Sequence, residues 1–427
     1  MRERSQEGRA PSIITSGALG ERLASKFPSF LKPMNLPILD VDPYSPALLL
    51  APYDYYRQVR ELGPVVRIDH YDVCAVARID LVEQVFRDWK TFRSSRGVGL
   101  ADFKKESPWR PPSIILEVDP PAHERTRTVM ARAMSPKAVK SMQDSFAIEA
   151  EACVSRAVEC GEVDGVADLA EAYPLKVFAD AVGLEDGDRS NLLRYGRMVF
   201  DALGPDNQIR RDSMACAELV VPWITARCQR EALKAGGFGQ TIYASCDTGD
   251  ITEDEASLLV RSLLSAGIDT TVATIGNMLY SIANHPHAWE TLKADHSRGS
   301  AAIEEVLRFE SPIHTFFRTI ANDTRLDDVD LAEGTKIMCV IAAANRDPRR
   351  WDRPDTFDIT RSSRPHVAFG SGIHVCVGQH VARQEAFALL SALLRHADSI
   401  EPAGAPEWRP ANAVHAPARL PLVLRAV

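Results

Sequence analysis

The residues best suited to chemistry surround Cys376, in residues 369–378, which read F-G-S-G-I-H-V-C-V-G. Two glycines precede this cysteine and a third follows it, so the backbone can turn tightly and lie flat against a large group. The apolar pattern that follows predicts a helix, whose N-terminal amides favour a thiolate. A thiolate held in this way suits the axial ligand of a haem iron. The alternative is a structural cysteine buried in a glycine-rich turn.

A second unusual segment is residues 265–271, S-A-G-I-D-T-T. Thr252 and Glu255 have the spacing of a capping box, and the apolar pattern then continues to Pro286. This predicts one helix of about 32 residues, or roughly 48 Å, which would cross the whole molecule. Small residues followed by an acid and hydroxyls pack poorly in a buried helix. We therefore expect this helix to open a groove for a ligand.

Both segments resemble sequences of the cytochrome P450 family. Residues 369–378 match its haem-binding loop, F-G-x-G-x-H-x-C-x-G, and residues 266–271 match the A-G-x-D-T-T motif of its long central helix. The resemblance implies the cytochrome P450 fold, which is mainly α with small β-sheets, wrapped around haem b. It implies Cys376 as the iron ligand, with Ala266 and Phe369 against the haem. It also implies Thr270 as the oxygen-activating residue and Asp269 as a proton relay.

The two polar residues of the helix also have simpler interpretations. The Thr270 hydroxyl can bond to the Ala266 carbonyl and bend the helix, and such a bend would itself make room for dioxygen and water. Asp269 can instead be a buried ion-pair partner. The sequence leaves these alternatives open.

Four basic residues are candidates to hold the haem carboxylates. His123 and Arg127 are four residues apart on a predicted helix and therefore share a face. Taken alone, they could equally be two solvated surface cations. The resemblance implies that they bind haem propionates together with Arg318 and His374.

Glu305 and Arg308 match the E-x-x-R pair of the family. Charged pairs at this spacing commonly decorate exposed helices, so the pair alone is weak. The resemblance implies a buried structural pair that supports the haem loop. Its usual third partner is unsettled, because Thr356 stands where many relatives have Arg, and Arg361 is a candidate.

A substrate anchor is suggested on the central helix. Arg261 and Ser265 precede Asp269 by eight and four residues, so the three side chains fall near one stripe, with Ser262 beside them. An arginine beside a pocket favours an anionic ligand. Arg96 is a second candidate carboxylate clamp. It lies in residues 91–121, the covering loop, which the resemblance implies covers the substrate. The alternative places Arg261 on the solvent side of its helix.

The resemblance is closest to bacterial P450s that O-demethylate para-methoxybenzoate, over residues 94–113, 258–271 and 309–319. In those enzymes the carboxylate end of the substrate lies at the positions of Arg96, Arg261, Ser262 and Ser265. Phe200 and Phe316 match aromatics that hold the ring. Leu203 stands where that group has a further Phe, which implies a somewhat wider pocket.

The remaining pattern fits one large domain. The 427 residues are 45% hydrophobic and 25% charged, and we expect a single haem domain over residues 37–427 after a mobile or loosely packed tail, residues 1–36. A helix ending near Leu62 is predicted to lead into a β-hairpin ending near Val76, and residues 91–121 are predicted to be irregular.

Composition limits the partners and the compartment. A net charge of −8 argues against general nucleic-acid binding. The eight cysteines are scattered without metal-knuckle spacing, and residues 1–36 contain no long apolar run, so we expect a cytoplasmic protein without a membrane anchor. We expect a monomer.

The predicted reaction needs external electrons. The resemblance implies an iron–sulfur ferredoxin, supplied by a flavin-dependent reductase, as the electron donor, and a small aromatic carboxylate as the substrate. Two alternatives remain open at this stage. The chain could hydroxylate a neutral terpene or polyketide, or it could be a haem-thiolate sensor without turnover.

Overall fold

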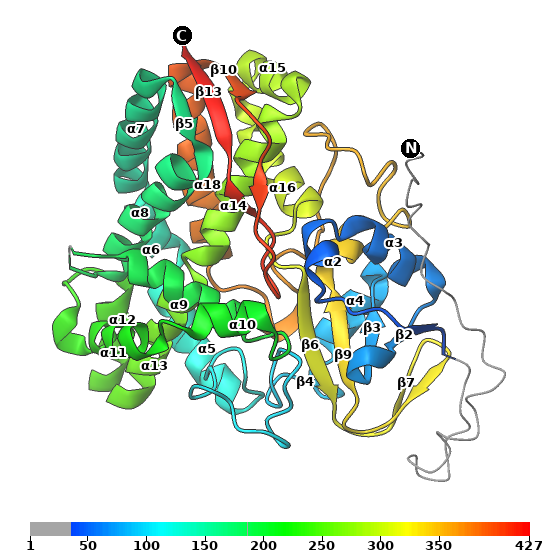
Figure 1. Cartoon of the computed structure of the whole chain (residues 1–427). Coiled ribbons are helices and arrows are strands. Elements are labelled where there is room, and N and C mark those ends of the chain that lie inside the picture. The colour runs from blue at the N-terminus through cyan, green and yellow to red at the C-terminus, as the bar shows by residue number, and fades with distance from the viewer. Residues whose placement is uncertain (1–35, 186) are drawn as a thin grey trace, which may run out of the picture.

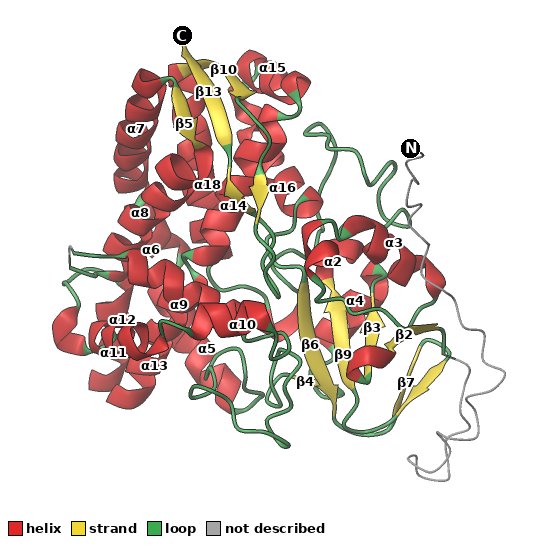
Figure 2. Ribbon diagram, viewed as in Figure 1, coloured by secondary structure: helices red, strands yellow, loops and turns green. Residues whose placement is uncertain are grey.

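The computed structural model describes residues 36–185 and 187–427 (Figure 1). The predicted tail, apart from Leu36, lies outside these residues. The predicted fold class is confirmed, since helices dominate and the strands form small sheets (Figure 2). Most helices gather on one side of the molecule and the largest sheet lies on the other side.

The helical side is organised around α18 (Gln379–His396), which packs on α7 (Gln143–Cys160) and α16 (Gly299–Phe309). Leu389, Leu390 and Leu393 of α18 are buried. Their spacing places them on one face of the helix, and burying that face stabilises the core. The helix that begins just after Cys376 is therefore fixed along its length.

The largest sheet has the strand order β1-β2-β3-β9-β6-β4. The predicted hairpin is confirmed, because β2 and β3 pair antiparallel, with Val66 opposite Ala75. In the centre of the sheet β9 pairs with β6, and Arg318 lies opposite Ile337. The strand bounds are β1 Ile38–Leu39, β2 Val66–Ile68, β3 Val73–Val76, β4 Phe92–Arg93, β6 Thr315–Ile320 and β9 Lys336–Val340.

The other elements frame these two parts. The strands of the smaller sheets are β5 Glu162–Asp164, β7 Thr324–Leu326, β8 Val329–Leu331, β10 Ala397–Pro402, β11 Glu407–Trp408, β12 Pro417–Arg419 and β13 Pro421–Ala426. The other helices are α2 Pro46–Leu50, α3 Tyr53–Leu62, α4 Ile79–Arg87, α5 Ala122–Ala133, α6 Pro136–Ser141, α8 Ala172–Val182, α9 Ser190–Asp201, α10 Gln208–Met214, α11 Ala217–Arg227, α12 Phe238–Asp247, α13 Glu253–Ala266, α14 Asp269–Ala283, α15 Pro286–Ala294 and α17 Ile341–Ala344.

The central helix differs from the prediction in one respect. Its capping box is confirmed, since Thr252 and Glu255 bond reciprocally to each other's backbone N–H. The prediction of one continuous helix was wrong, because α13 ends at Ala266 and α14 begins at Asp269. The Thr270 hydroxyl donates to the Ala266 carbonyl at 2.6 Å, so the back-bonding alternative is confirmed. Such bonds compete with the helical ladder and open it locally.

The segment Glu253–Ala283 is long and apolar enough to cross a membrane by length and composition. However, 67% of its most apolar window is buried inside the protein. This is the pattern of a core helix, whose apolar surface is already covered by its neighbours.

The helix break can be tested at Gly267. A Cβ at this position would lie 2.1 Å from the Phe178 ring, whereas one at Gly276 would meet nothing closer than 3.5 Å. We expect Gly267→Ala to lower the thermal midpoint by overpacking, at a cost of about 1–3 kcal/mol. The control Gly276→Ala should keep or raise the midpoint, because Ala favours helix. Equal midpoints for the two variants would contradict close packing at the break.

Candidate active site

The cysteine loop is shaped by two glycines with left-handed backbone. Gly370 and Gly372 have φ of 72° and 73°. A Cβ on Gly372 would lie 2.5 Å from the Phe86 carbonyl oxygen, so the loop lies directly against the end of α4. The Cys376 N–H donates to the Phe369 carbonyl at 2.9 Å. The glycines are thus required by backbone conformation and by close approach.

The surroundings of the Cys376 sulfur include groups that favour its anion. Burial raises the pKa of the thiol, while the backbone N–H groups of Gly378 and Gln379 and the charges of Arg127 and Arg383 act in the opposite direction. Gln379 is the first residue of α18. The amides at the start of this helix therefore point at the sulfur, which suits a thiolate ligand.

The four predicted carboxylate-binding residues come together near this loop. The rings of His123 and His374 are 4.4 Å apart, and neither nitrogen of His123 has a hydrogen-bond partner among the described residues. Arg318 is 4% exposed, and its guanidinium bonds only to the adjacent Phe317 carbonyl among the described residues. Burial lowers the pKa of both Arg318 and Arg127.

Buried donors without acceptors are costly, so this group requires an anion. Two guanidinium groups and two imidazoles beside a cysteine fit a flat cofactor that carries two carboxylates. Ala266 is exposed although it lies in the middle of the central helical segment, which leaves a surface there for a large ligand. The residues present fit haem b.

Comparisons with known proteins agree with this fit. The chain is 48% identical over 391 residues to cytochrome p450 CYP199A2 of Rhodopseudomonas palustris. The aligned region covers 91% of this chain and 95% of that protein. It belongs to the cytochrome P450 family. The family model for cytochrome P450 matches residues 300–412.

Two further P450s show the same relationship. Cytochrome P450 107B1 of Saccharopolyspora erythraea is 31% identical over 374 residues, covering 84% of this chain and 91% of its own. The structure of CYP109Q5 from Chondromyces apiculatus matches with a TM-score of 0.77 at 28% identity, over 91% of this chain and 99% of that one. The chain is accordingly a haem b-binding P450 monooxygenase.

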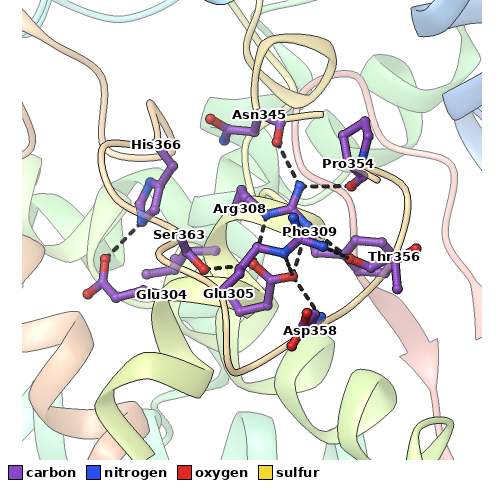
Figure 3. Close-up of polar contacts among 12 residues, drawn as sticks. Glu304, Glu305, Arg308, Phe309, Asn345, Pro354, Thr356, Asp358, Ser363 and His366 are labelled. Atoms are coloured by element: carbon purple, nitrogen blue, oxygen red, sulfur yellow. Dashed lines mark hydrogen bonds and ion pairs between the residues drawn. The ribbon is translucent and has the colours of Figure 1, made fainter. Parts of the chain in front are cut away.

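A buried ion pair lies beneath residues 345–363, the chain that leads to the cysteine loop. Glu305 and Arg308 on α16 are fully buried and joined by two bonds of 2.8 Å (Figure 3). Arg361, the candidate third partner, pairs with Glu305 at 3.1 Å. Both arginines also donate to the Thr356 carbonyl. The cluster thus uses the backbone of this residue, so a threonine can occupy the position.

Glu304 bonds to residues on both sides of the cysteine loop, which the motif did not reveal. Its carboxylate accepts from Arg364 and from Arg383, each at 2.5 Å, and from His366 at 2.9 Å. Arg364 and His366 precede the cysteine loop, and Arg383 follows it. The Arg383 guanidinium also lies 4.4 Å from the centre of the Phe369 ring. Glu304 therefore ties the two ends of the loop together, and only the acidic doublet 304–305 signalled it.

Asp269 is 4% exposed and lies where α9 crosses the helix break. A Cβ on Gly196 of α9 would lie 2.7 Å from the Asp269 Cβ, so the two backbones are very close. Burial raises the pKa of Asp269, and the charges of Arg409 and Arg197 oppose this. One carboxylate oxygen has no partner among the described residues. Asp269 is thus near two arginines but forms no ion pair with either in the described structure.

The predicted ring-binding residues meet in one apolar cluster. Phe200 of α9 is buried there, and Leu203 and Phe316 pack against the same cluster. Ala273 of α14 belongs to it as well. Residues from three separate parts of the chain therefore belong to one hydrophobic cluster.

The predicted anchor residues also lie together. The Arg261 guanidinium donates to the Pro111 carbonyl at 2.8 Å. The Ser262 hydroxyl lies 3.3 Å from that of Ser113, a residue not singled out in the sequence, and the Ser265 hydroxyl donates to the Ser262 carbonyl at 3.2 Å. Helix α13 and the covering loop thus meet along this stripe, and Arg261 does not lie free in solvent.

Arg96 is placed differently from the prediction. It is 9% exposed, and its guanidinium forms two bonds with the carboxylate of Asp102, one of them at 2.9 Å. Burial raises the pKa of Asp102, but the bonds from Arg96 and from the Lys104 N–H outweigh it and lower the pKa overall. Because Asp102 already neutralises this guanidinium, we leave Arg96 out of the proposed substrate anchor.

The role of Glu304 predicts a pH-dependent stability. Burial alone would raise its pKa, but the bonds from His366, Arg364 and Arg383 hold it well below the ordinary value. The folded protein therefore keeps this carboxylate charged, while the unfolded chain protonates it near pH 4.5. We expect Glu304→Gln to cost about 1–3 kcal/mol at neutral pH.

The difference in stability between Glu304→Gln and wild type should shrink as the pH falls below 4.5. Thermal midpoints recorded between neutral pH and acid measure it, with the reduced carbon monoxide spectrum as a check on thiolate ligation. The control Glu290→Gln removes an exposed carboxylate whose one bond within residues 36–185 and 187–427 is to His287, and it should have little effect. A constant difference across the pH range would argue against a charged Glu304.

Proposed function

We propose that this P450 oxidises a small para-substituted benzoic acid, and that it O-demethylates 4-methoxybenzoate. The observation that carries this proposal is the pairing of two surfaces. Arg261, Ser262 and Ser265 form a polar stripe on α13, while Phe200 and Phe316 lie in an apolar cluster that also includes part of α14. A flat acid has the same two parts, a carboxylate and an apolar ring.

The polar stripe suits a carboxylate for a physical reason. Arg261 uses one nitrogen to hold the covering loop, at the Pro111 carbonyl, which leaves further N–H donors on the same guanidinium. The Ser262 hydroxyl donates to the Leu258 carbonyl and lies 3.3 Å from the Ser113 hydroxyl, so these two hydroxyls would turn toward an anion only by giving up those bonds. A charged group bound there is stabilised by short, charge-assisted bonds.

The apolar cluster limits the size of the ring end. Phe200 and Phe316 supply flat surfaces, and Leu203 replaces a third aromatic of the group that this chain resembles. A leucine is smaller than a phenylalanine, so we expect para substituents somewhat larger than methoxy to bind as well. This affects the range of substrates more than the type of reaction.

The haem roles follow from the same geometry. We assign Cys376 as the iron ligand and His123, Arg127, Arg318 and His374 to the carboxylates. Bound haem supplies the activation of oxygen. In the net reaction one oxygen atom enters the methyl C–H bond, and the product collapses to a phenol and formaldehyde. The second oxygen leaves as water, with two electrons and two protons supplied from outside.

Asp269 and Thr270 are assigned to proton transfer. The Thr270 Oγ1 donates to the Ala266 carbonyl, so its lone pairs remain able to accept a proton or orient water. The raised pKa of Asp269 favours a carboxyl that carries a proton and can give it up. One oxygen of Asp269 has no partner among the described residues, so it is available to a water molecule in such a relay.

We assign electron delivery to a ferredoxin with a flavin-dependent reductase. A surface hollow beside the start of α18 is lined by residues that include Lys140, His380 and Arg383. His380 and Arg383 follow the cysteine loop directly in sequence, and these basic groups suit an acidic iron–sulfur protein. We place the enzyme in the cytoplasm as a monomer.

The substrate is tested by titrating the ferric protein with 4-methoxybenzoate and with its methyl ester. We expect the acid, and not the ester, to shift the Soret band from low to high spin. Arg261→Met should weaken binding of the acid at least about tenfold, because a charge-assisted bond is lost. Its binding of neutral ligands should be unchanged.

The same titration tests the alternatives. If the ester or a neutral terpene shifts the spectrum and the acid does not, the enzyme hydroxylates neutral substrates. If no product forms with oxygen and a reconstituted electron supply, while the acid still binds, 4-methoxybenzoate is a ligand of this enzyme and not its substrate.

The proton relay is tested at two adjacent threonines. Both hydroxyls bond back to the helix, Thr270 to Ala266 and Thr271 to Gly267 at 2.8 Å. We expect Thr270→Ala to lower the yield of product per oxygen consumed by about tenfold or more. Thr271→Ala removes the same kind of bond and should leave this ratio near that of wild type. Equal ratios for the two variants would remove Thr270 from the relay.

A further inference from the structure

Lys336 is a buried lysine whose ammonium group is surrounded by backbone carbonyls of the covering loop. It begins β9 and is 6% exposed. Its Nζ donates to the carbonyls of Gly97 at 2.8 Å, Gly99 at 3.0 Å and Arg96 at 3.2 Å. An ammonium has three donors, and all three are used on one short stretch of chain.

The loop can present these carbonyls to one point only because of its glycines. Gly97 has φ of 93°, and a Cβ there would lie 2.8 Å from the Ala101 carbonyl oxygen. A Cβ on Gly99 would lie 2.6 Å from the Leu203 carbonyl oxygen. Three carbonyl dipoles directed at one point repel each other unless a cation lies between them.

The loop joins the sheet to the end of α9. The Phe317 N–H on β6 donates to the Val98 carbonyl at 2.8 Å, and the Leu100 N–H donates to the Leu203 carbonyl at 2.8 Å. Leu203 and Phe316 pack against the apolar cluster assigned to the substrate ring. A displacement of residues 96–100 would therefore move Leu203, which forms part of the proposed pocket wall.

The charges around Lys336 leave the carbonyls as its main partners. Asp102 attracts it but is already paired with Arg96, and Arg96 itself repels it, as does Arg318 on β6. Glu117 attracts it from farther along the loop. Burial lowers the pKa of Lys336 to about 7, so the tests below belong near pH 6, where the group is charged.

We propose that Lys336 is a positioning residue for substrate binding, a built-in cation around which residues 96–100 fold so that Leu203 is held against the substrate. The choice of 4-methoxybenzoate as the substrate rests on the proposed function, but the role of Lys336 in ordering residues 96–100 does not. The two are therefore measured separately.

The first experiment compares Lys336→Met with the control Lys293→Met, in the haem-loaded protein. Lys293 also donates to two backbone carbonyls, those of Ala397 and Leu394, but lies outside the covering loop. We expect Lys336→Met to speed hydrogen exchange of the Leu100 and Phe317 amides by about tenfold or more. The dissociation constant for 4-methoxybenzoate should rise about tenfold, with the reduced carbon monoxide spectrum unchanged.

The second experiment restores the cation. Lys336→Ala leaves the space of the side chain, so added ammonium or methylammonium should slow loop exchange and tighten binding again. Neither ion should rescue Lys336→Met, whose side chain fills the space. Lys336→Arg keeps the charge and is measured in parallel, so that a methionine variant that does not fold still leaves a test. We expect its loop exchange to lie closer to wild type than that of the alanine variant.

Unchanged exchange of the Leu100 and Phe317 amides in Lys336→Met would overturn the proposal, whatever the substrate. So would a failure of both ions to act on Lys336→Ala. If exchange changes as expected but wild type does not bind 4-methoxybenzoate, the proposed function fails while the role of Lys336 in the loop stands.

Discussion

The structure depends most on the buried carboxylates of two adjacent glutamates, Glu304 and Glu305. The cysteine loop is rich in glycine and contains two left-handed positions, so it has little intrinsic preference for one shape. Glu305 fixes the chain before the loop through Arg308 and Arg361. Glu304 bonds to His366 before the loop (Figure 3) and to Arg383 after it, and so joins the two ends of the loop. These bonds hold the sulfur in place at the start of α18, where the helix amides favour its charge.

On the other side of the proposed site, threonine hydroxyls compete with backbone N–H groups for the carbonyls of the central helix. Hydroxyls at 270 and 271 bond to carbonyls one turn earlier, and the ladder opens at residues 267 and 268. Gly196 lets α9 lie against this opening, which buries Asp269 near the positive charges of Arg197 and Arg409. The same helix α9 leads to Leu203, whose carbonyl holds the covering loop. The proposed proton relay and the proposed substrate contact thus share one structural element.

Short sequence motifs correctly predicted the features that depend on residues close together in the chain. The capping box at Thr252, the hairpin before Val76 and the back-bond of Thr270 are all confirmed, because each depends on residues a few positions apart. The continuity of the central helix was predicted wrongly. Periodicity continued through Gly267, and the pattern alone could not show that Phe178 packs there and that hydroxyls interrupt the ladder.

The sequence by itself determined the family, the cysteine loop and the acid–alcohol pair, because these chemistries require particular residue types at fixed spacing. Only the tertiary structure decided which charges are free. Arg96 meets Asp102 because the covering loop folds back on itself, and Lys336 meets three carbonyls of that loop across more than two hundred residues of chain. A charge that is neutralised by a distant part of the chain cannot be distinguished in sequence from one that awaits a ligand, since only the fold sets their separation.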